Sequence, residues 1–247
     1  MTRTRRATVA MLLVGLAIFS SLYSTQAILP TLVQNMGLSS TEAAMTVSAA
    51  TGALALCVVP ASILSERFGR GRILLISAVS ATSVGLIVPL AAEGWLLILL
   101  RGLQGALLSG APATAMAWLS EELDDKALPR AMGLYIAGTS VGGLTGRLIP
   151  TGLVEISTWR WALFGSALVS LAFAITSWLL LPAQRNFRPK SIHLTSESRA
   201  LFGHWANRDL ALLFLTAFLS MGTFVSMYNF LTFRLIDDFG LAPSLAG

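Results

Sequence analysis

The chain has 247 residues, of which 55% are hydrophobic and only 12% are charged, and its formal net charge is +5. A soluble domain carries about twice that share of charged residues, so the composition indicates a membrane protein. The basic residues are scattered between apolar segments without an aromatic-interleaved patch, which argues against a nucleic-acid partner. The single cysteine excludes an internal disulfide and argues against a cysteine-based metal site.

Seven segments are long and apolar enough to span a membrane, which requires about 20 residues in a helix. Charged residues occur in them only near the ends, apart from Arg101 and Arg147. The sequence therefore predicts an all-α membrane protein. The predicted spans, in chain order, are Thr8–Pro30, Glu42–Leu64, Ile73–Ala92, Trp95–Leu119, Ala131–Leu153, Trp161–Leu181 and Asp209–Phe233.

The distribution of the 17 lysines and arginines predicts the orientation of these spans. Most of them lie before the first span, between the second and third, between the fourth and fifth, or in residues 182–208. Because basic residues are retained on the cytoplasmic side, we expect a cytoplasmic N-terminus and the C-terminus of this chain outside. The expected location is the bacterial cytoplasmic (inner) membrane.

A charged turn, SERFGRGR, separates the second and third spans. Its arginines could serve only to set the orientation, but this does not explain Glu66, a carboxylate at the C-terminal end of a helix, where the helix dipole disfavours it. We therefore expect Glu66 to meet a helix N-terminus or an arginine, and Glu66 and Arg70 to engage Glu121 or Glu122. The residues of this candidate conformational motif are Ser62, Glu66, Arg67, Gly69, Arg70 and Arg72.

The fourth span contains Arg101, followed on the same helix face by Gln104 and Gly105. An arginine inside a membrane span is energetically costly, which makes it a candidate for a functional site. Gln104 can bond to the guanidinium group, and Gly105 leaves room for a close neighbour. The alternative is that Arg101 extends outward to the membrane surface.

The fifth span is rich in glycine and carries a second arginine, Arg147. Gly138 and Gly142 form a small-x-x-x-small face that allows close helix contact, so simple packing is an alternative to a functional role. We expect Arg101 and Arg147 to line the outer half of one cavity, where they would favour an anionic substrate group or pair with a carboxylate from another helix. The glycines of this candidate motif are Gly138, Gly142, Gly143 and Gly146.

Together these patterns resemble the signatures of the major facilitator superfamily, in particular its drug:proton-antiporter-like branch. The charged turn is similar to the loop signature G-x-L-x-D-R-x-G-R, with Ser62 and Glu66 in place of the first glycine and the aspartate. The fourth span is similar to the motif R-x-x-Q-G. The fifth looks like the antiporter motif G-x-x-x-G-P-x-x-G-G, with Gly143 and Arg147 in place of the proline and the last glycine.

The resemblance implies a major facilitator fold that is incomplete in this chain. Residues 1–181 would form an N-terminal six-helix transmembrane bundle, residues 182–208 a cytoplasmic basic linker, and residues 209–247 the first helix of an incomplete C-terminal bundle. Helices one, four and seven line the cavity in this family, which implies cavity positions for Tyr23, Gln26, Tyr228 and Asn229. Missing C-terminal helices, or a second chain, would complete the cavity.

The implied function is secondary active transport of a small molecule by alternating access, with proton-coupled efflux favoured over facilitator-type uptake. The alternative is a truncated, non-transporting fragment or an interaction subunit. A membrane-embedded enzyme is disfavoured because no span shows HExxH, GxSxG or paired carboxylates, and no GxxxxGK[ST] motif supports a drive by ATP. We expect no cofactor and no metal; the expected partners are the substrate, protons and the lipid bilayer.

Overall fold

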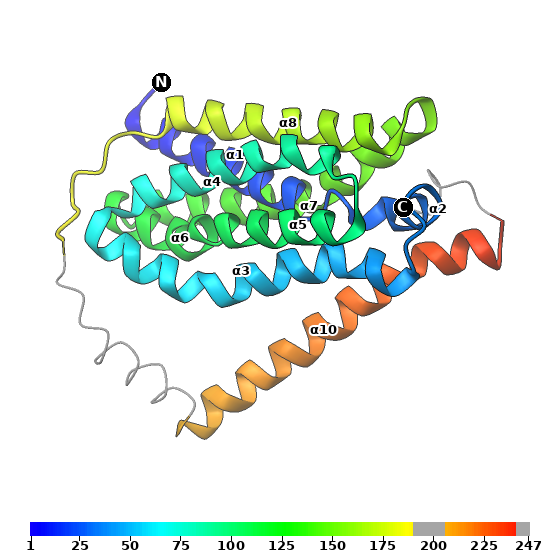
Figure 1. Ribbon diagram of the computed structural model, residues 1–247. Coiled ribbons are helices and arrows are strands. Elements are labelled where there is room, and N and C mark those ends of the chain that lie inside the picture. The colour runs from blue at the N-terminus through cyan, green and yellow to red at the C-terminus, as the bar shows by residue number, and fades with distance from the viewer. Residues whose placement is uncertain (190–205, 241–247) are drawn as a thin grey trace.

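The computed structural model describes residues 1–189 and 206–240, and the regular structure of these residues is helical (Figure 1). Each predicted span corresponds to one helix or to two or three consecutive helices. The bounds are α1 Arg3–Leu22, η1 Gln26–Ile28 (a short 3-10 helix), α2 Leu29–Met36, α3 Ser40–Phe68, α4 Arg70–Ile87, η2 Val88–Leu90 (also 3-10), α5 Gly94–Leu108, α6 Gly110–Glu122, α7 Leu128–Ile156, α8 Trp159–Leu180 and α10 Arg208–Asp237.

Six helical segments within the described ranges are long and apolar enough to cross a membrane, judged by length and composition. They correspond to six of the seven predicted spans. The remaining one is the fifth predicted span, which forms α7. It is not among the six although it has 29 residues, because its glycines and Arg147 lower its mean hydropathy. It nevertheless packs along α1 inside the bundle.

Two predicted spans contain breaks that the span prediction does not anticipate. The first is interrupted between Leu22 and Leu29, and the fourth at Ser109. Each break lies about one turn before a proline, Pro30 or Pro112, whose nitrogen carries no hydrogen and cannot bond the carbonyl four residues earlier. The break after α1 leaves carbonyl groups at the end of that helix without helical partners.

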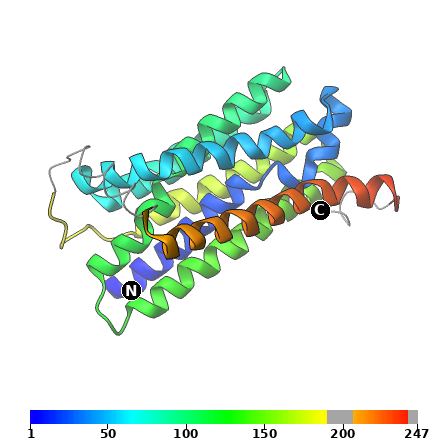
Figure 2. The same ribbon diagram turned by 90° about the horizontal axis from the view of Figure 1, so that it is seen from below.

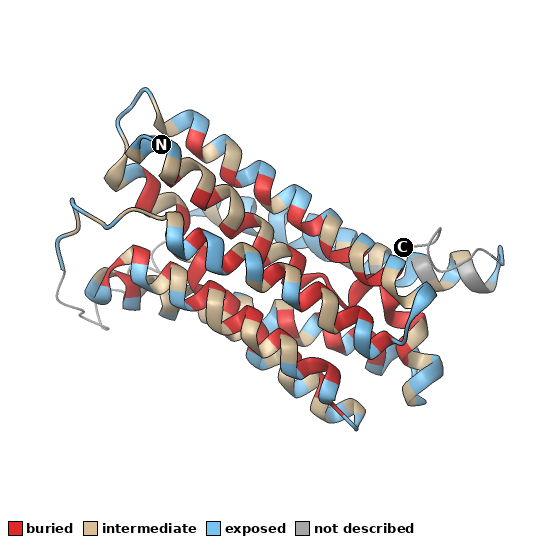
Figure 3. Ribbon diagram, turned by 90° about the horizontal axis from the view of Figure 1, so that it is seen from above, coloured by how far each residue is buried: buried red, intermediate tan, exposed pale blue. Residues whose placement is uncertain are grey.

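The bundle is built around α1, which packs against α7 on one side and α8 on another. α3 packs along α5, and α4 packs against both α6 and α8. Buried residues gather between the helices rather than on their outer faces (Figure 3). They form two apolar clusters, one around Met11 and Trp118 near the N-terminus of the chain and one around Leu32 and Leu97 near α2.

Local signals explain where α3 and α4 begin. Ser39 and Glu42 form a capping box, in which the Glu42 carboxylate accepts from the Ser39 backbone N–H at 2.8 Å. Gly69 separates α3 from α4 with a φ of 101°, a conformation that side chains rarely adopt. The charged turn is therefore as tight as the sequence predicts.

The last helix, α10, lies along the outside of the bundle and crosses it obliquely (Figure 2). It contacts α2 and η1, at the end of the bundle opposite to the chain N-terminus. Most of its described side chains are exposed. The predicted linker falls largely on residues 190–205, which lie outside the described part of the chain.

Candidate functional site

Four of the predicted cavity residues meet at the break after α1. Tyr23 and Gln26 lie within it, and both are buried. Arg101 reaches it from α5, and Arg147 reaches it from α7. The sequence places these residues in three different spans, and the fold brings them to one short segment of chain.

The Arg101 guanidinium is fully buried and is held by the broken end of α1. Its Nη1 donates to the Ser21 carbonyl at 3.0 Å, and its Nη2 donates to the Leu22 carbonyl. Its Nε donates to the Thr46 carbonyl of α3 at 3.2 Å. The C-terminal end of a helix is the negative end of its dipole, so a cation is stabilised there without a carboxylate. Arg101 thus points into the bundle, and the alternative that it extends to the membrane surface is wrong.

Gln104 connects Arg101 to two more helices. Its Oε1 accepts from Arg101 Nη1 at 2.5 Å, which confirms the predicted bond between the two side chains. Its Nε2 donates to Ser21 Oγ at 2.7 Å and to the Ala81 carbonyl of α4 at 3.2 Å. Together Arg101 and Gln104 link α5 to α1, α3 and α4, which makes them a scaffold for the break.

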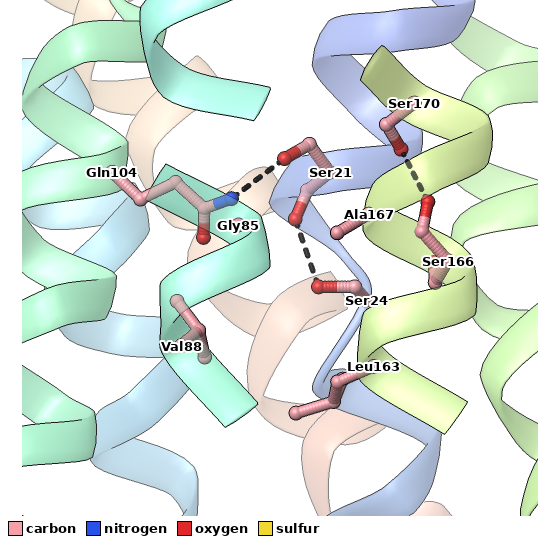
Figure 4. A pocket seen from close by; sticks show the side chains of 9 residues that line it. All are labelled: Ser21, Ser24, Gly85, Val88, Gln104, Leu163, Ser166, Ala167 and Ser170. Atoms are coloured by element: carbon pink, nitrogen blue, oxygen red, sulfur yellow. Dashed lines mark hydrogen bonds between the residues drawn. The ribbon is translucent and has the colours of Figure 1, made fainter. Parts of the chain in front are cut away.

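A small cavity beside Gln104 separates α1, α4 and α8 (Figure 4). Its volume is about 10 Å³, close to the minimum for one water molecule. The Ser166 hydroxyl, which faces this region, is buried and has no hydrogen-bond partner among the described residues. The cavity suits a bound water and is too small for a transported substrate.

Gly105 makes room for a close neighbouring helix, as the sequence predicts. A Cβ atom at this position would overlap the backbone of Ala50 on α3. The glycine is therefore required for the contact between α3 and α5.

Arg147 has a different environment from Arg101. Its Nε donates to Gln26 Oε1 at 2.9 Å, and its Nη1 donates to the Gly143 carbonyl at 2.8 Å. The guanidinium carbon lies 4.3 Å from the ring centre of Tyr23 and also 4.3 Å from that of Tyr228. Tyr228 belongs to α10, so Arg147 joins the bundle to the last helix through stacking and cation–π contacts.

The two arginines have different surroundings, and the expectation that both line one cavity stays a prediction. Backbone carbonyls enclose Arg101, whereas aromatic rings flank Arg147. Neither forms an ion pair with a carboxylate of residues 1–189 or 206–240. Of the two intramembrane arginines, Arg147 is thus the one that contacts α10, through Tyr228. The side chain of Asn229, also predicted for the cavity, lies outside the described part of the structure.

The glycines of α7 act mainly in packing. Cβ atoms at Gly142 and Gly146 would come within 2.8 Å and 2.6 Å of α1 carbonyl oxygens, those of Gly15 and Ser20. Gly138 makes a similar close approach to α1, whereas Gly143 faces the Arg147 and Tyr23 side chains. The packing interpretation of this motif therefore accounts for three of its four glycines.

The charged turn forms an ion cluster at the opposite end of the bundle. Arg70 Nε donates to Glu121 Oε1 at 2.5 Å, and Arg70 Nη2 lies 3.5 Å from Glu66. This confirms the prediction that the turn engages Glu121. Glu122 pairs instead with Arg3, at 2.5 Å.

The other members of the turn have separate positions. The Ser62 carbonyl accepts from the Ser65 hydroxyl at 2.6 Å, and Arg67 lies over the Phe68 ring at 5.5 Å. Arg72 is exposed at the first turn of α4. The conformational role of the whole motif stays a prediction.

Two residues that contribute to the site were not identified from the sequence. Gly15 on α1 is the counterpart of the α7 glycines, since a Cβ there would lie 2.8 Å from the Thr139 nitrogen. The presence of a glycine within an apolar span could have indicated the close approach at Gly15. Gln184, just after α8, accepts from the Gly71 N–H at 3.2 Å and donates to Glu121 at 3.0 Å. Nothing in the local sequence distinguishes it.

Comparison with known proteins identifies the fold. The sequence profile of the Major Facilitator Superfamily matches residues 11–247. The chain belongs to the Major Facilitator Superfamily. Members of this superfamily are transporters and not enzymes, and together with the apolar helices this makes the chain a multi-pass membrane protein.

The relatives are longer than this chain. It is 36% identical over 231 residues to the inner membrane transport protein YnfM of Escherichia coli (strain K12), which covers 94% of the chain and 55% of YnfM. It is 32% identical to the uncharacterized MFS-type transporter YybF of Bacillus subtilis (strain 168), covering 94% of the chain and 57% of YybF. The chain thus spans little more than half the length of these curated relatives.

A solved structure shows the same fold. A bacterial homologue of the human lysosomal transporter Spinster, in an inward-facing and unoccupied conformation, superposes with a TM-score of 0.80. The match covers the whole of this chain and 58% of that chain, at 17% sequence identity. At this identity the similarity concerns the fold alone.

Proposed function

We propose that the full-length protein is a secondary active transporter, which moves a small molecule across the membrane by alternating access between two helical halves. Residues 1–181 would form the first half, residues 182–208 the cytoplasmic linker, and residues 209–247 the start of the second half. The remainder of the second half would come from C-terminal helices outside this chain or from a second chain.

The observation that carries the proposal is the position of Arg147 between Tyr23 of the bundle and Tyr228 of α10. In alternating access the two halves separate at one end while they meet at the other, so a contact between them must break in each cycle. Arg147 and the two tyrosines would act as a clasp that closes one end of the cavity.

The same residue suggests the substrate class. Arg147 has no carboxylate partner among the described residues, and charge-assisted bonds to an arginine are strongest for carboxylates and phosphates. An anionic group of the substrate would compete with Gln26 for the guanidinium and would loosen the clasp on binding. Proton-coupled export is the favoured direction, because the three sequence motifs resemble the antiporter branch; uptake is the alternative.

The remaining predicted residues have supporting roles in this proposal. Arg101 and Gln104 would hold the broken end of α1, so that Tyr23 and Gln26 keep their positions. The Glu66–Arg70–Glu121 cluster would stabilise one conformation at the end that carries the N-terminus, which is expected to be cytoplasmic.

Transport assays in everted membrane vesicles test the proposal. Anionic, neutral and cationic compounds would be compared for the chain and for two variants, Arg147→Gly and Arg147→Lys. Loss of a charged hydrogen bond costs about 1.5–3 kcal/mol, so flux of an anionic substrate should fall roughly 10- to 100-fold in Arg147→Gly and less in Arg147→Lys. An uncoupler should abolish the flux if protons drive it. Equal flux of every anion in Arg147→Gly would refute the role of this residue.

A second candidate is that the 247-residue chain transports nothing by itself. The observation in its favour is that α10 contacts the bundle mainly at α2, at η1 and at Arg147 of α7, and leaves most of its described side chains exposed. A folded, inserted chain without flux, together with flux after fusion to the second half of YnfM, would support this candidate.

A further inference from the structure

A pocket of about 810 Å³ opens at the end of the bundle where α4 begins and α8 ends. Its walls come from the end of α3, from α4, from α6, from α8 and from the segment that follows α8. It lies at the opposite end of the bundle from the break after α1, and its described lining residues are not those of the cavity at Gln104. The volume is in the range of pockets that hold small ligands.

The pocket is positively charged. Arg67 and Arg72 line it, and neither forms an ion pair with any described residue. Arg70, between them in the sequence, is by contrast neutralised by Glu66 and Glu121 outside the pocket lining. No carboxylate is among the described residues that line it. Two guanidinium groups that lack an ion pair within the described part of the chain favour an anionic ligand.

Backbone and indole N–H groups add to this polarity. The N-terminus of α4 lies in the wall, and its N-cap, Gly69, provides no side chain to bond the free N–H groups. Trp118 also lines the pocket; it is fully buried, and its indole N–H has no hydrogen-bond partner among the described residues. A Cβ atom placed on Gly71 would lie 2.9 Å from this nitrogen, so the indole N–H and the start of α4 are adjacent.

The side chain of Gln184 covers these donors. Gln184 Oε1 accepts from the Gly71 N–H at 3.2 Å and lies beside the indole. An amide oxygen there occupies the place that an oxygen of an anion would take. If Gln184 swings away, the Gly71 and Trp118 N–H groups become available to one acceptor.

The remaining wall is apolar and reaches the outer surface of the bundle. Ile76 is 52% exposed and Trp178 is 47% exposed, and both line the pocket together with Leu75. In a membrane protein, exposed apolar side chains on the outer face of a bundle contact lipid, and tryptophan is favoured at the level of the head groups. The pocket therefore combines an anion site with a lipid-facing apolar groove.

We propose that this pocket binds the head group of an anionic phospholipid. The phosphate lies between Arg67 and Arg72 at the N-terminus of α4, with one oxygen directed at the Trp118 indole. An acyl chain lies along Leu75, Ile76 and Trp178. Basic pockets between membrane helices recognise anionic head groups by this combination of charges and apolar walls. Free phosphate shares the anionic chemistry but would leave the apolar groove unused.

Native mass spectrometry of the full 247-residue chain tests the proposal. The chain would be purified in detergent, supplied with equal amounts of phosphatidylglycerol and phosphatidylcholine, and examined for retained lipid. We expect selective retention of phosphatidylglycerol. Each basic residue near an anionic lipid contributes about fivefold, so Arg67→Gln with Arg72→Gln should weaken the retention on the order of thirtyfold.

The matched control removes two other exposed arginines at the same end of the bundle, Arg5→Gln with Arg130→Gln, which line a different surface hollow. This control should retain phosphatidylglycerol as the parent does. Equal losses in the two double variants would overturn the proposal, since they would indicate general surface charge. Equal retention of phosphatidylcholine would overturn it too, as would displacement of the lipid by millimolar inorganic phosphate.

A further variant, Trp118→Phe, examines the position of the phosphate. It keeps an aromatic ring in the core and removes the N–H donor together with the rest of the five-membered ring of the indole. Retention of phosphatidylglycerol should fall severalfold, with unchanged elution on size-exclusion chromatography as the test of folding. Unchanged retention in this variant would refute the assignment of the phosphate to the indole.

Discussion

The close contact between α1 and α7 allows a sharp test, because some glycines of α7 lie against α1 and others have no neighbour within 4 Å. In Gly146→Ala, the new Cβ would lie 2.6 Å from the Ser20 carbonyl oxygen and 2.8 Å from the Ser20 Cα. Both partners are backbone atoms and cannot turn aside, so α1 and α7 must move apart. At Gly133, on the same helix, no atom lies within 4 Å of an added Cβ.

The magnitude follows from two opposing terms. Overpacking in a well-packed interior costs about 1–3 kcal/mol. Replacing glycine by alanine inside a helix recovers about 0.8–1.0 kcal/mol. The balance for Gly146→Ala is a loss of up to about 2 kcal/mol, and that for Gly133→Ala is a gain of up to about 1 kcal/mol.

Thermal unfolding in detergent, followed by size-exclusion chromatography of the heated samples, measures both effects. One kcal/mol corresponds to about 2–4 °C for a chain of this size, so Gly146→Ala should melt several degrees below Gly133→Ala. Gly152→Ala, also without neighbours within 4 Å, should behave like Gly133→Ala. If all three variants melted at the same temperature, the close contact between α1 and α7 would not exist in the protein.

Three more predictions concern charged groups. Arg101→Lys should melt several degrees below the parent, because one ammonium group cannot reach the separate acceptors that bind the guanidinium. The same thermal assay measures this, and an unchanged melting temperature would contradict the scaffold role. Tyr228→Leu should weaken the contact between α10 and Arg147, whereas Tyr228→Phe should preserve it because it keeps an aromatic ring. Disulfide cross-linking between α10 and α2 measures this contact. Equal cross-linking in both variants would argue against the cation–π contact. Arg70→Gln should destabilise the chain by about 1 kcal/mol or more. The double variant Arg70→Gln with Glu121→Gln should be destabilised by less than the sum of the two single effects. Additive shifts of the melting temperature would contradict the ion pair.

The two intramembrane arginines show how far sequence reasoning reaches. Both were recognisable as candidates because arginine is costly inside a span. Their roles differ because α1 breaks between them: its free carbonyls bind Arg101, and its following turn presents Tyr23 and Gln26 to Arg147. The cause of the break, Pro30, is visible in the sequence, but which side chains reach the freed carbonyls depends on the packing of other helices.

Apolar length, basic-residue bias and short motifs are local properties of the chain, and the sequence by itself determined from them the helical membrane class, the spans and the superfamily. The choice between alternative interaction partners was decided by the tertiary structure. Glu121 and Glu122 are adjacent, yet one binds Arg70 and the other binds Arg3, because neighbouring helices approach them from different directions. The pocket at the start of α4 likewise exists only where helices and the segment after α8 converge. Contacts of this kind depend on the approach of distant elements, for which local sequence patterns carry no physical record.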